Sequence, residues 1–443
     1  MQGLSSVGCR VDLCKSVTTT PSMFYATTTS KYDGAIMVTA SHLPADKNGF
    51  KMYIHDTKYM ARGLEKEEVR KILEDAEVDE SNDDDSLDPP PPPMVVDFVP
   101  TYQSHLIETF RRRTSRILPL KNLNVVLSTG CGSGFIVSRV FRDLGANVME
   151  LDAEPDGTFP FGPPNPESKS MMRRTIKYCE QVGSVDLAIL LDTDGDRCGI
   201  VLRNGETYKE VNRNRLIALC SQIILEKNGD STAKIVTDSV TSINLESFIA
   251  RAGGSQVRFK KGYLNVINEA KRLSAIGEEV PLAMETSGHG AFKDNNYCDD
   301  GTFTALLVAC FVAENNSKGI IEDFEDAGFE EELRMAVKET YDKVSLYEQI
   351  SSAITKEAAS IEGWEFDPHN KEGIRITTDS GRGFFMIRTS LHDPIISMQI
   401  EAASPNLGRQ VVATVRQIVQ AALEGVDPLD FRELDSFINE DGK

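Results

Sequence analysis

The order strand–helix–strand recurs along this chain and constrains its fold more than any other feature of the sequence. Residues 124–151 read as an apolar strand, a glycine-rich turn, a helix and a second strand, and residues 234–259 repeat the strand–helix–strand order. A chain of 443 residues is too long for a single hydrophobic core. We therefore predict an α/β protein with three successive mixed-sheet α/β domains of similar topology and a C-terminal α+β domain, arranged around a central cleft.

The sequence divides into four predicted domains, at residues 1–93, 94–212, 213–329 and 330–443. At the end of the first domain, residues 79–93 combine an acidic run with five prolines, and such a tract cannot form a hydrophobic core. We interpret it as a linker or surface insertion; a docking motif for a proline-reading module is the alternative. In the last domain, grouped strands precede an amphipathic helix, which is typical of an α+β domain.

A small hydroxyl follows the apolar run 35–38, which we expect to form a buried strand. Ser41 comes just after this run, His42 is its neighbour, and Lys51 lies ten positions further on, behind an Asn-Gly turn. A serine that accepts and returns a phosphoryl group needs an exposed position, a nearby proton carrier and a cation. Ser41 is therefore a candidate phosphoryl acceptor; a capping serine in a Ser/Thr-rich loop is the alternative.

Three carboxylates, those of Asp192, Asp194 and Asp196, follow the apolar run 185–191 at alternate positions, and Arg197 comes next. In an extended backbone alternate side chains share a face, so the three carboxylates can converge on one point. They repel one another unless a cation lies among them, and an all-oxygen ligand set suits Mg²⁺. A calcium loop of the EF-hand type, for which the glycine comes one position too early, and a solvated acidic turn are the alternatives.

The net charge of −20 limits the partners of the chain. It repels nucleic acid and anionic membranes, so we expect neither as a partner. It also repels a phosphorylated small molecule, whose site must therefore hold its own cations. The candidates are Lys51, Arg197, Lys260, Lys261 and Arg388. The eight cysteines show no CxxC spacing, so we expect reduced thiols in an intracellular protein. No apolar run approaches membrane-spanning length.

Four stretches, in this order, resemble the motifs of the α-D-phosphohexomutase family, which includes phosphoglucomutase, phosphomannomutase and phosphoglucosamine mutase. The first two are Ser41 with its flanking residues and the aspartate loop after residue 191. Glu285-Thr286-Ser287-Gly288-His289 is similar to the family's sugar-binding loop, E-x-S-G-H. Residues 388–394 occupy the place of its phosphate-binding loop, usually R-x-S-G-T-E-P. Together the four stretches span nearly the whole chain.

The resemblance implies an intramolecular phosphotransferase that interconverts hexose 1-phosphate and hexose 6-phosphate through a phosphoserine and a bisphosphate intermediate. It implies Mg²⁺ at Ser41, Asp192, Asp194 and Asp196, and hexose 1,6-bisphosphate as activator. It also implies catalytic roles for Ser41, His42, Lys51 and Arg197. Lys51, with His42 beside Ser41, is the best candidate for the general acid/base, because we expect neighbouring cations to lower the Lys51 pKa. The substrate-binding residues that it implies are Lys261, Tyr263, Glu285, Ser287, His289, Arg388, Ser390 and His392. We expect a monomer or weak homodimer, in the cytoplasm or the plastid stroma.

The chain departs from the family pattern in three places. Leu391-His392-Asp393 stand where the family loop has Gly-Thr-Glu, and this variant is similar to that of plant and algal phosphohexomutase-like members. Tyr263 stands where many members carry a histidine. The resemblance implies a strand, a helix and an arginine-bearing loop before the serine, which this sequence does not show. Either the gene model is truncated or the first domain lacks a sheet edge, which would leave apolar surface exposed. A phosphatase-like enzyme and a catalytically weakened relative that binds sugar phosphates remain the alternatives.

The glycine-rich turn 130–134 mimics a nucleotide-binding fingerprint, because it opens a helix and an acidic residue follows about twenty residues later. Glycines are also needed wherever a strand turns sharply into a packed helix. The next loop, residues 154–167, is similar to the second-domain loop of the phosphohexomutases and has no place in a methyltransferase. We therefore favour the phosphohexomutase interpretation over dinucleotide or S-adenosylmethionine binding.

Overall fold

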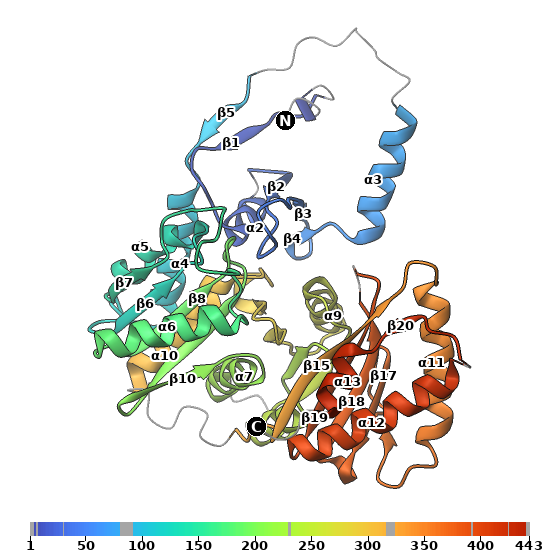
Figure 1. Cartoon of the computed structure of the whole chain (residues 1–443). Helices are drawn as coiled ribbons and strands as arrows, with labels where there is room; N and C mark the ends of the chain where they lie inside the picture. Colours follow the sequence, from blue (N-terminus) through green and yellow to red (C-terminus); the bar gives the residue numbers. More distant parts are fainter. Residues whose placement is uncertain are drawn as a thin grey trace.

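The computed structural model arranges the chain in five β-sheets with helices packed against them (Figure 1). The residues that it describes are 4–5, 8–29, 31–79, 92–228, 232–315, 324–390, 393–423 and 425–439. The predicted acidic and proline-rich insertion therefore lies almost wholly outside the described residues.

The N-terminal part holds two small sheets. One is a parallel pair and the other is a three-stranded antiparallel sheet of order β2-β3-β4. Helix α2 begins after Thr19, whose hydroxyl accepts a hydrogen bond from the Ser22 amide, and Pro21 occupies a first-turn position. The elements are β1 (Asp12–Cys14), α2 (Thr20–Thr28), β2 (Gly34–Val38), β3 (Phe50–Asp56), β4 (Met60–Gly63), α3 (Lys66–Asp79) and β5 (Met94–Val96).

The prediction that residues 35–38 form a buried strand is wrong in its burial. The strand exists as β2, but Ile36 is 40% exposed and Val38 57% exposed. Side chains of a strand alternate between the two faces of its sheet, and α2 packs on β2, β3 and β4 while Ile36, Val38 and Phe50 face outward. The expected exposed apolar surface of the first domain is therefore present.

We call the sheets of the second and third predicted domains the second sheet and the third sheet. The second sheet, of order β10-β9-β8-β6-β7, is mixed: β7, β6 and β8 run parallel, and β9 and β10 are antiparallel to their neighbours. Both of its faces are buried, which explains the nearly continuous apolar run of β8. Val126 and Leu190 pack with α6, whereas Leu127 and Leu191 face a core shared with α4, α5, α7 and α10. The elements are α4 (Val99–Thr114), β6 (Asn124–Ser128), the 3₁₀ helix η1 (Ser133–Val137), α5 (Ser138–Asp143), β7 (Asn147–Leu151), α6 (Lys169–Val182), β8 (Leu187–Leu191), β9 (Cys198–Asn204) and β10 (Thr207–Val211).

The third sheet, of order β12-β11-β13-β14, repeats this plan, with three parallel strands and one antiparallel strand. One face packs on α9. The other face contributes Ile235, Leu282 and Met284 to the same hydrophobic core that fills one side of the second sheet. The elements are α7 (Asn214–Asn228), β11 (Lys234–Thr237), α8 (Ile243–Arg251), β12 (Ser255–Arg258), α9 (Tyr263–Ala275), β13 (Leu282–Met284), β14 (Gly290–Phe292), η2 (Lys293–Asn295) and α10 (Gly301–Asn315).

The C-terminal part is a six-stranded sheet of order β16-β17-β18-β19-β15-β20 whose pairs are all antiparallel. One face packs on α11, α12 and α13. The other face buries Phe384 and Met386 with Val240 of the third sheet's loop. The elements are β15 (Phe329–Val337), α11 (Lys343–Ala358), β16 (Glu365–Phe366), β17 (Ile374–Thr378), η3 (Asp379–Gly381), β18 (Gly383–Thr389), β19 (Ile395–Ala402), α12 (Pro405–Ala422), β20 (Leu429–Asp430) and α13 (Arg432–Asn439).

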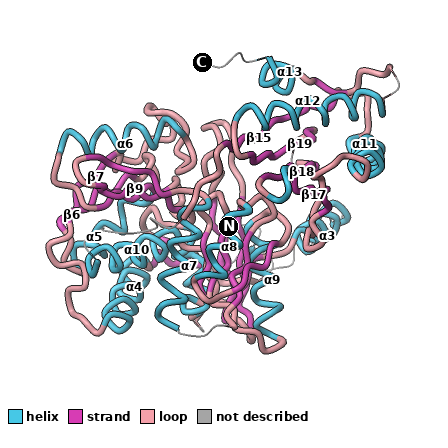
Figure 2. The backbone as a smooth tube through the Cα atoms, turned by 90° about the horizontal axis from the view of Figure 1, so that it is seen from below, coloured by secondary structure: helices cyan, strands magenta, loops and turns pink. Residues whose placement is uncertain are grey.

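Seen from below, α7, α8 and α9 lie between α4, α5, α6 and α10 on one side and α11, α12 and α13 on the other (Figure 2). All eight cysteines lie in described segments and are free thiols, six of them buried. Among the described residues, no helix is both long enough and apolar enough to cross a membrane.

Candidate active site

Ser41 lies in the turn that follows β2, and this turn is attached to the aspartate loop of the second sheet. The Ser41 backbone is left-handed, with φ of 53°, and its amide donates to Thr39 Oγ1 at 2.8 Å. The Thr193 hydroxyl donates to the Ser41 carbonyl at 2.6 Å. Two loops that are 152 positions apart in the chain are thus hydrogen bonded side by side.

The aspartate loop begins where β8 ends, so its carboxylates leave the buried edge of the second sheet together. Asp192, Asp194 and Asp196 are at most 2% exposed, and one oxygen of each lies within 4.8 Å of the others. Ser41 Oγ donates to Asp192 Oδ2 at 3.1 Å. The structure therefore brings the candidate serine and the three aspartates into one group.

Two cations lie against these carboxylates. Arg197 is 4% exposed; its backbone amide and Nε donate to the two oxygens of Asp192 at 3.1 and 2.9 Å. Its Nη2 also contacts Ser41 Oγ and His42 Nδ1. Lys51 Nζ donates to Asp194 Oδ2 at 2.9 Å and also contacts Asp196. All four residues predicted to be catalytic therefore lie in this group.

Burial and these neighbours shift the proton affinities of the group. Burial, and then repulsion from Asp196, raise the pKa of Asp192. Burial, and then the charge of Arg197, lower the pKa of His42 to about 4, so its imidazole is neutral at neutral pH. For Lys51, burial opposes the charge, but Asp196 and Asp194 outweigh it and hold its pKa well above the ordinary value. The prediction of a lowered Lys51 pKa is wrong, because carboxylates and not cations are its nearest partners.

The aspartate group fits a divalent cation. Oδ1 of Asp194 and Oδ1 of Asp196 are buried and have no hydrogen-bond partner among the described residues. An unpaired buried carboxylate oxygen is costly, and a metal ion is one way to satisfy it. The ligand atoms are all oxygens, which favours Mg²⁺ over softer transition metals.

The glycine-rich turn 130–134 supports this loop. The backbone amide and the hydroxyl of Ser133 donate to the Thr193 carbonyl at 2.6 and 2.8 Å. A Cβ on Gly132 would clash with the backbone of Thr193, so only glycine fits there. The glycines that mimic a nucleotide fingerprint thus allow two loops of this sheet to approach closely.

The sugar-loop motif begins at Glu285, directly after β13. Glu285 is 4% exposed, its Oε1 accepts the Gly262 amide at 2.5 Å, and the Ser287 hydroxyl donates to its Oε2 at 3.3 Å. Burial, and then repulsion from Asp238, raise the pKa of Glu285 to about 7. The Cys198 amide donates to the Gly288 carbonyl at 3.0 Å, which ties this loop to the residue after Arg197.

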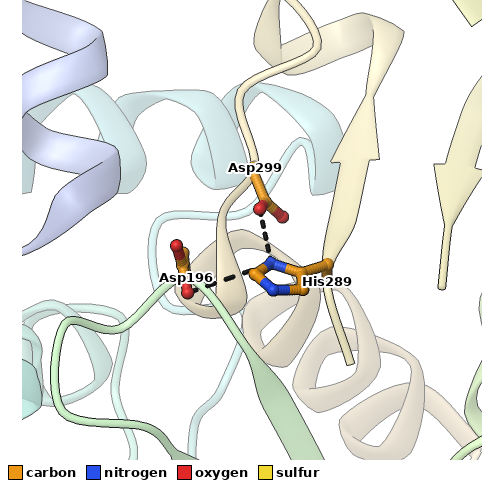
Figure 3. A group of neighbouring side chains, drawn as sticks. All are labelled: Asp196, His289 and Asp299. Carbon is orange, nitrogen blue, oxygen red and sulfur yellow. Dashed lines mark hydrogen bonds and ion pairs between the residues drawn. The ribbon is translucent and has the colours of Figure 1, made fainter. Parts of the chain in front are cut away.

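His289 links the sugar loop to the aspartate loop (Figure 3). Its Nδ1 lies 2.5 Å from Asp299 Oδ2 and 3.9 Å from Asp196 Oδ1. The Tyr263 ring stacks on the imidazole at a centroid distance of 5.0 Å. Burial opposes the charge of His289, but Asp299 and then Asp196 outweigh it and raise its pKa to about 9.

Sequence reasoning missed two residues of this site. Asp299 was not among the candidates, although it belongs to an acidic pair directly before the apolar helix α10, and this pair is the signal that could have marked it. Thr20, whose hydroxyl donates to Asp194 Oδ2 at 2.6 Å, was also missed. Thr20 lies in the first turn of α2 and carries no comparable signal.

The predicted residues that remain among those described, Lys261, Arg388 and Ser390, each contact the C-terminal part. The Lys261 amide donates to Glu372 Oε2 at 2.9 Å, which joins the loop before α9 to the C-terminal part. Arg388 of β18 is 9% exposed, and its Nη2 lies 3.6 Å from Glu332 Oε1 on β15, two strands away in the same sheet. The Ser390 carbonyl accepts a hydrogen bond from Lys343 Nζ at 2.8 Å. His392, predicted to bind substrate, lies outside the described residues.

Three family models match the chain, and together they cover more than half of it. They are the phosphoglucomutase/phosphomannomutase alpha/beta/alpha domain I over residues 1–79, domain II over residues 100–205 and domain III over residues 212–326. Similar curated proteins include a phosphomannomutase/phosphoglucomutase of Pseudomonas syringae pv. tomato, 27% identical over 97% of this chain and 84% of the relative. A probable phosphoglucosamine mutase of Methanopyrus kandleri is also 27% identical, over 96% of this chain and 87% of the relative.

Solved structures agree on the fold. A phosphoglucomutase/phosphomannomutase family protein of Burkholderia thailandensis superimposes with a TM-score of 0.73 at 24% identity, covering 96% of this chain and 86% of that chain. An N-acetylphosphoglucosamine mutase of Aspergillus fumigatus gives a TM-score of 0.58 at 16% identity, covering 90% of this chain and 91% of that chain. The order of sheets, the loops that meet at Ser41 and the family matches agree, and this chain belongs to the α-D-phosphohexomutase family of phosphoglucomutases and phosphomannomutases.

Proposed function

We propose that this chain interconverts hexose 1-phosphate and hexose 6-phosphate, with Ser41 carrying the phosphoryl group between substrate molecules. One observation carries the proposal: the Ser41 hydroxyl lies 3.1 Å from Asp192 inside the buried aspartate group. Arg197 contacts the same hydroxyl. A phosphorylated serine would carry close to two negative charges, and this is a place where cations of the chain and a divalent ion can balance them.

Each half of the reaction exchanges one phosphorus–oxygen bond for another. A hydroxyl of the sugar monophosphate bonds to the phosphorus of phosphoserine 41, the bond to Ser41 Oγ breaks, and a hexose 1,6-bisphosphate results. The sugar hydroxyl gives up one proton and Ser41 Oγ gains one. In the second half Ser41 Oγ loses its proton and bonds to the other phosphorus. The bond from that phosphorus to the sugar oxygen breaks, and this oxygen takes up a proton as the isomeric monophosphate leaves. Atoms and charge therefore balance over the cycle.

We assign to His42 the transfer of the proton to and from Ser41 Oγ. Its neutral ring has Nδ1 at 3.3 Å from that oxygen. Arg197 stabilises the charge on the serine oxygen when the phosphorus–oxygen bond breaks. Lys51 stays an ammonium and orients Asp194 and Asp196. A Mg²⁺ ion held by Ser41, Asp192, Asp194 and Asp196 would supply charge neutralisation at the transferred phosphoryl group.

We assign the sugar hydroxyls to Glu285, Ser287 and His289, which the sugar loop carries next to Arg197. We assign the phosphate that is not transferred in a given half-reaction to five cationic or polar side chains. These are Lys261, Tyr263, Arg388, Ser390 and His392. The names of two solved structures support this substrate class, since Aspergillus fumigatus N-acetylphosphoglucosamine mutase is described in complex with GlcNAc-6P and magnesium, and a single-residue variant of that enzyme in complex with glucose 1,6-bisphosphate.

We further propose that each loop belongs to its own domain, at residues 1–93, 94–212, 213–329 and 330–443. Hexose 1,6-bisphosphate acts as the activator because it phosphorylates Ser41. The protein acts inside the cell, in the cytoplasm or the plastid stroma, as a monomer or weak homodimer. No contact among the described residues favours a purely sugar-phosphate-binding role.

The test compares the protein with Ser41→Ala and with the control Ser360→Ala. Ser360 lies far along the chain, and its exposed hydroxyl bonds the Glu357 carbonyl at 2.8 Å at the end of α11. Each protein is incubated with Mg²⁺, a trace of bisphosphate and a panel of hexose 1-phosphates. We expect isomerisation by the protein and the control, and none by Ser41→Ala, with one added phosphate by intact mass only when Ser41 is present. Isomerisation by Ser41→Ala, or release of inorganic phosphate in place of isomerisation, contradicts the proposal.

A further inference from the structure

The carboxylate of Asp299, which lies outside the sequence motifs, binds two nitrogen groups at the end of the sugar loop, the His289 imidazole and the Gly290 backbone amide. Its Oδ2 lies 2.5 Å from His289 Nδ1 and its Oδ1 accepts the Gly290 amide at 3.0 Å. The backbones of Asp299 and Ala291 also pair in an antiparallel bridge. Asp299 is 8% exposed. One buried carboxylate therefore fixes both the side chain of His289 and the backbone that follows it.

One flat surface of the His289 ring and the edge that carries Nε2 have different surroundings. The Tyr263 ring stacks on one surface, with an interplanar angle of 21°. No hydrogen bond to Nε2 is present among the described residues, and the His289 side chain is 12% exposed. Figure 3 shows Nδ1 directed at Asp299 with Nε2 on the other side of the ring. The contact with Asp299 occupies Nδ1 and leaves Nε2 without a hydrogen bond among the described residues.

The same ring is anchored to the aspartate loop. His289 pairs by backbone with Arg197, and Asp196 Oδ1 lies 3.9 Å from Nδ1. A 180° flip of the imidazole about its Cβ–Cγ bond would put the carbon Cδ2 in the place of Nδ1, break the bond to Asp299 and leave a buried carboxylate oxygen without a partner. Such an oxygen costs on the order of 1–3 kcal/mol, so the observed orientation is the stable one.

We propose that Asp299 is a positioning residue for the mutase reaction: its carboxylate accepts a hydrogen bond from Nδ1 of His289, with Tyr263 packed on the ring, so that Nε2 is the nitrogen presented to the sugar phosphate. The part of this inference that concerns substrate rests on the proposed function. The part that concerns the orientation of the ring does not. Asp299 need not touch the substrate, because it acts through His289.

The test uses the fact that the chain has six histidines, so a histidine-labelled sample gives few nitrogen signals. The signals of His289 are assigned by their loss in His289→Gln. In the unsubstituted protein at pH 7 we expect a hydrogen on Nδ1 of His289, strongly shifted downfield by the short bond to Asp299. This spectrum is independent of activity, so it remains decisive even if the chain isomerises none of the hexose phosphates tried.

Asp299→Asn keeps the shape of the side chain, but its amide has one oxygen for two N–H donors. We expect the downfield signal to be lost or moved upfield and kcat/KM for the hexose phosphate to fall on the order of 100-fold, the effect of a misplaced contact group. The Ser41 phosphate measured by intact mass should stay. Asp299→Glu should restore part of both the signal and the rate.

The matched control is the adjacent carboxylate, Asp300, which bonds the Tyr102 hydroxyl at 2.8 Å and Asn295 at 3.1 Å and has no bond to His289. Asp300→Asn should lower the stability of the protein and leave the His289 signal in place. An unprotonated Nδ1 in the unsubstituted protein, as in the other tautomer or with a metal ion on that nitrogen, overturns the inference. So does an Asp299→Asn protein with an unchanged His289 signal and an unchanged kcat/KM.

Discussion

Arg375 is a buried charge at the contact between the C-terminal sheet and the third sheet, and its replacement by methionine should loosen that contact. The side chain is 1% exposed. It donates to the carbonyls of Ser239 and Thr241 at 2.8 and 3.0 Å, and its Nε lies 3.2 Å from Asp367 Oδ2. Burial, and then repulsion from Arg258, lower the pKa of Arg375 to about 9, so it remains charged at neutral pH.

The free-energy cost of Arg375→Met comes from the buried hydrogen-bond acceptors that lose their donor. Asp367 keeps Arg258 at 2.8 Å, so it retains one cation. The two backbone carbonyls lose a charged donor, and each unsatisfied buried acceptor costs about 1–3 kcal/mol. Methionine still fills the space beside Phe384, on which the guanidinium stacks at 3.4 Å. We therefore expect the substitution to lower the free energy of unfolding of the C-terminal part by about 3 kcal/mol.

The chain contains one tryptophan, Trp364, which packs on Phe385 in the C-terminal core, so its fluorescence reports on this part alone. With a urea dependence of about 1.5 kcal/mol per molar, the midpoint should fall by about 2 M. The control is Arg382→Met, because Arg382 is 71% exposed and pairs only with nearby Asp379, so its midpoint should hardly move. Equal midpoints for the two variants would refute the reasoning.

Three further predictions concern the site and its supports. Gly288→Ala should lower kcat/KM by about 100-fold or more with an unchanged far-UV spectrum, because its φ is +92° and a Cβ would lie 2.5 Å from the Cys198 carbonyl oxygen; wild-type kinetics in the variant would contradict this. Asp194→Asn should weaken Mg²⁺ binding in calorimetry and lower kcat by about 100- to 1,000-fold, and unchanged heats of Mg²⁺ binding would exclude Asp194 as a ligand. Burial raises the pKa of Glu401 to about 7, above its ordinary value in the unfolded chain. Between these two pKa values the folded state binds one proton more than the unfolded state. The free energy of unfolding should therefore fall as pH rises from about 4.5 to 7, by up to about 3 kcal/mol. Glu401→Gln should flatten that slope in Trp364-monitored urea curves at pH 5 and pH 8, and an equal slope in both proteins would contradict the assignment.

Local sequence pattern was sufficient to place the strand ends of the site. The apolar runs before Ser41, Asp192 and Glu285 all form strands, and each motif starts at or shortly after a strand end, as the periodicity predicts. Pattern could not show that Ser41 and Asp192, 151 positions apart, share a hydrogen bond. That expectation came from the resemblance to a family, since no local rule fixes which strand ends face one another.

The wrong predictions share a different cause, which is that they depended on tertiary packing and not on the local pattern. The burial of residues 35–38 depended on how many faces of their sheet carry a helix, and α2 packs on this sheet with Ile36 and Val38 left facing outward. The direction of the Lys51 pKa shift depended on Asp194 and Asp196, which lie more than 140 positions away. Asp299 escaped notice because the acidic pair before α10 does not by itself show that one of its carboxylates contacts His289.

The core that the second and third sheets share has a consequence for how this chain can be divided. Leu191 at the base of the aspartate loop and Met284 at the base of the sugar loop belong to one apolar cluster. A cut near residue 212 would open that cluster on both fragments, whereas a cut near residue 328 would leave the C-terminal cluster intact. Fragment complementation should therefore succeed at the later site and give insoluble halves at the earlier one.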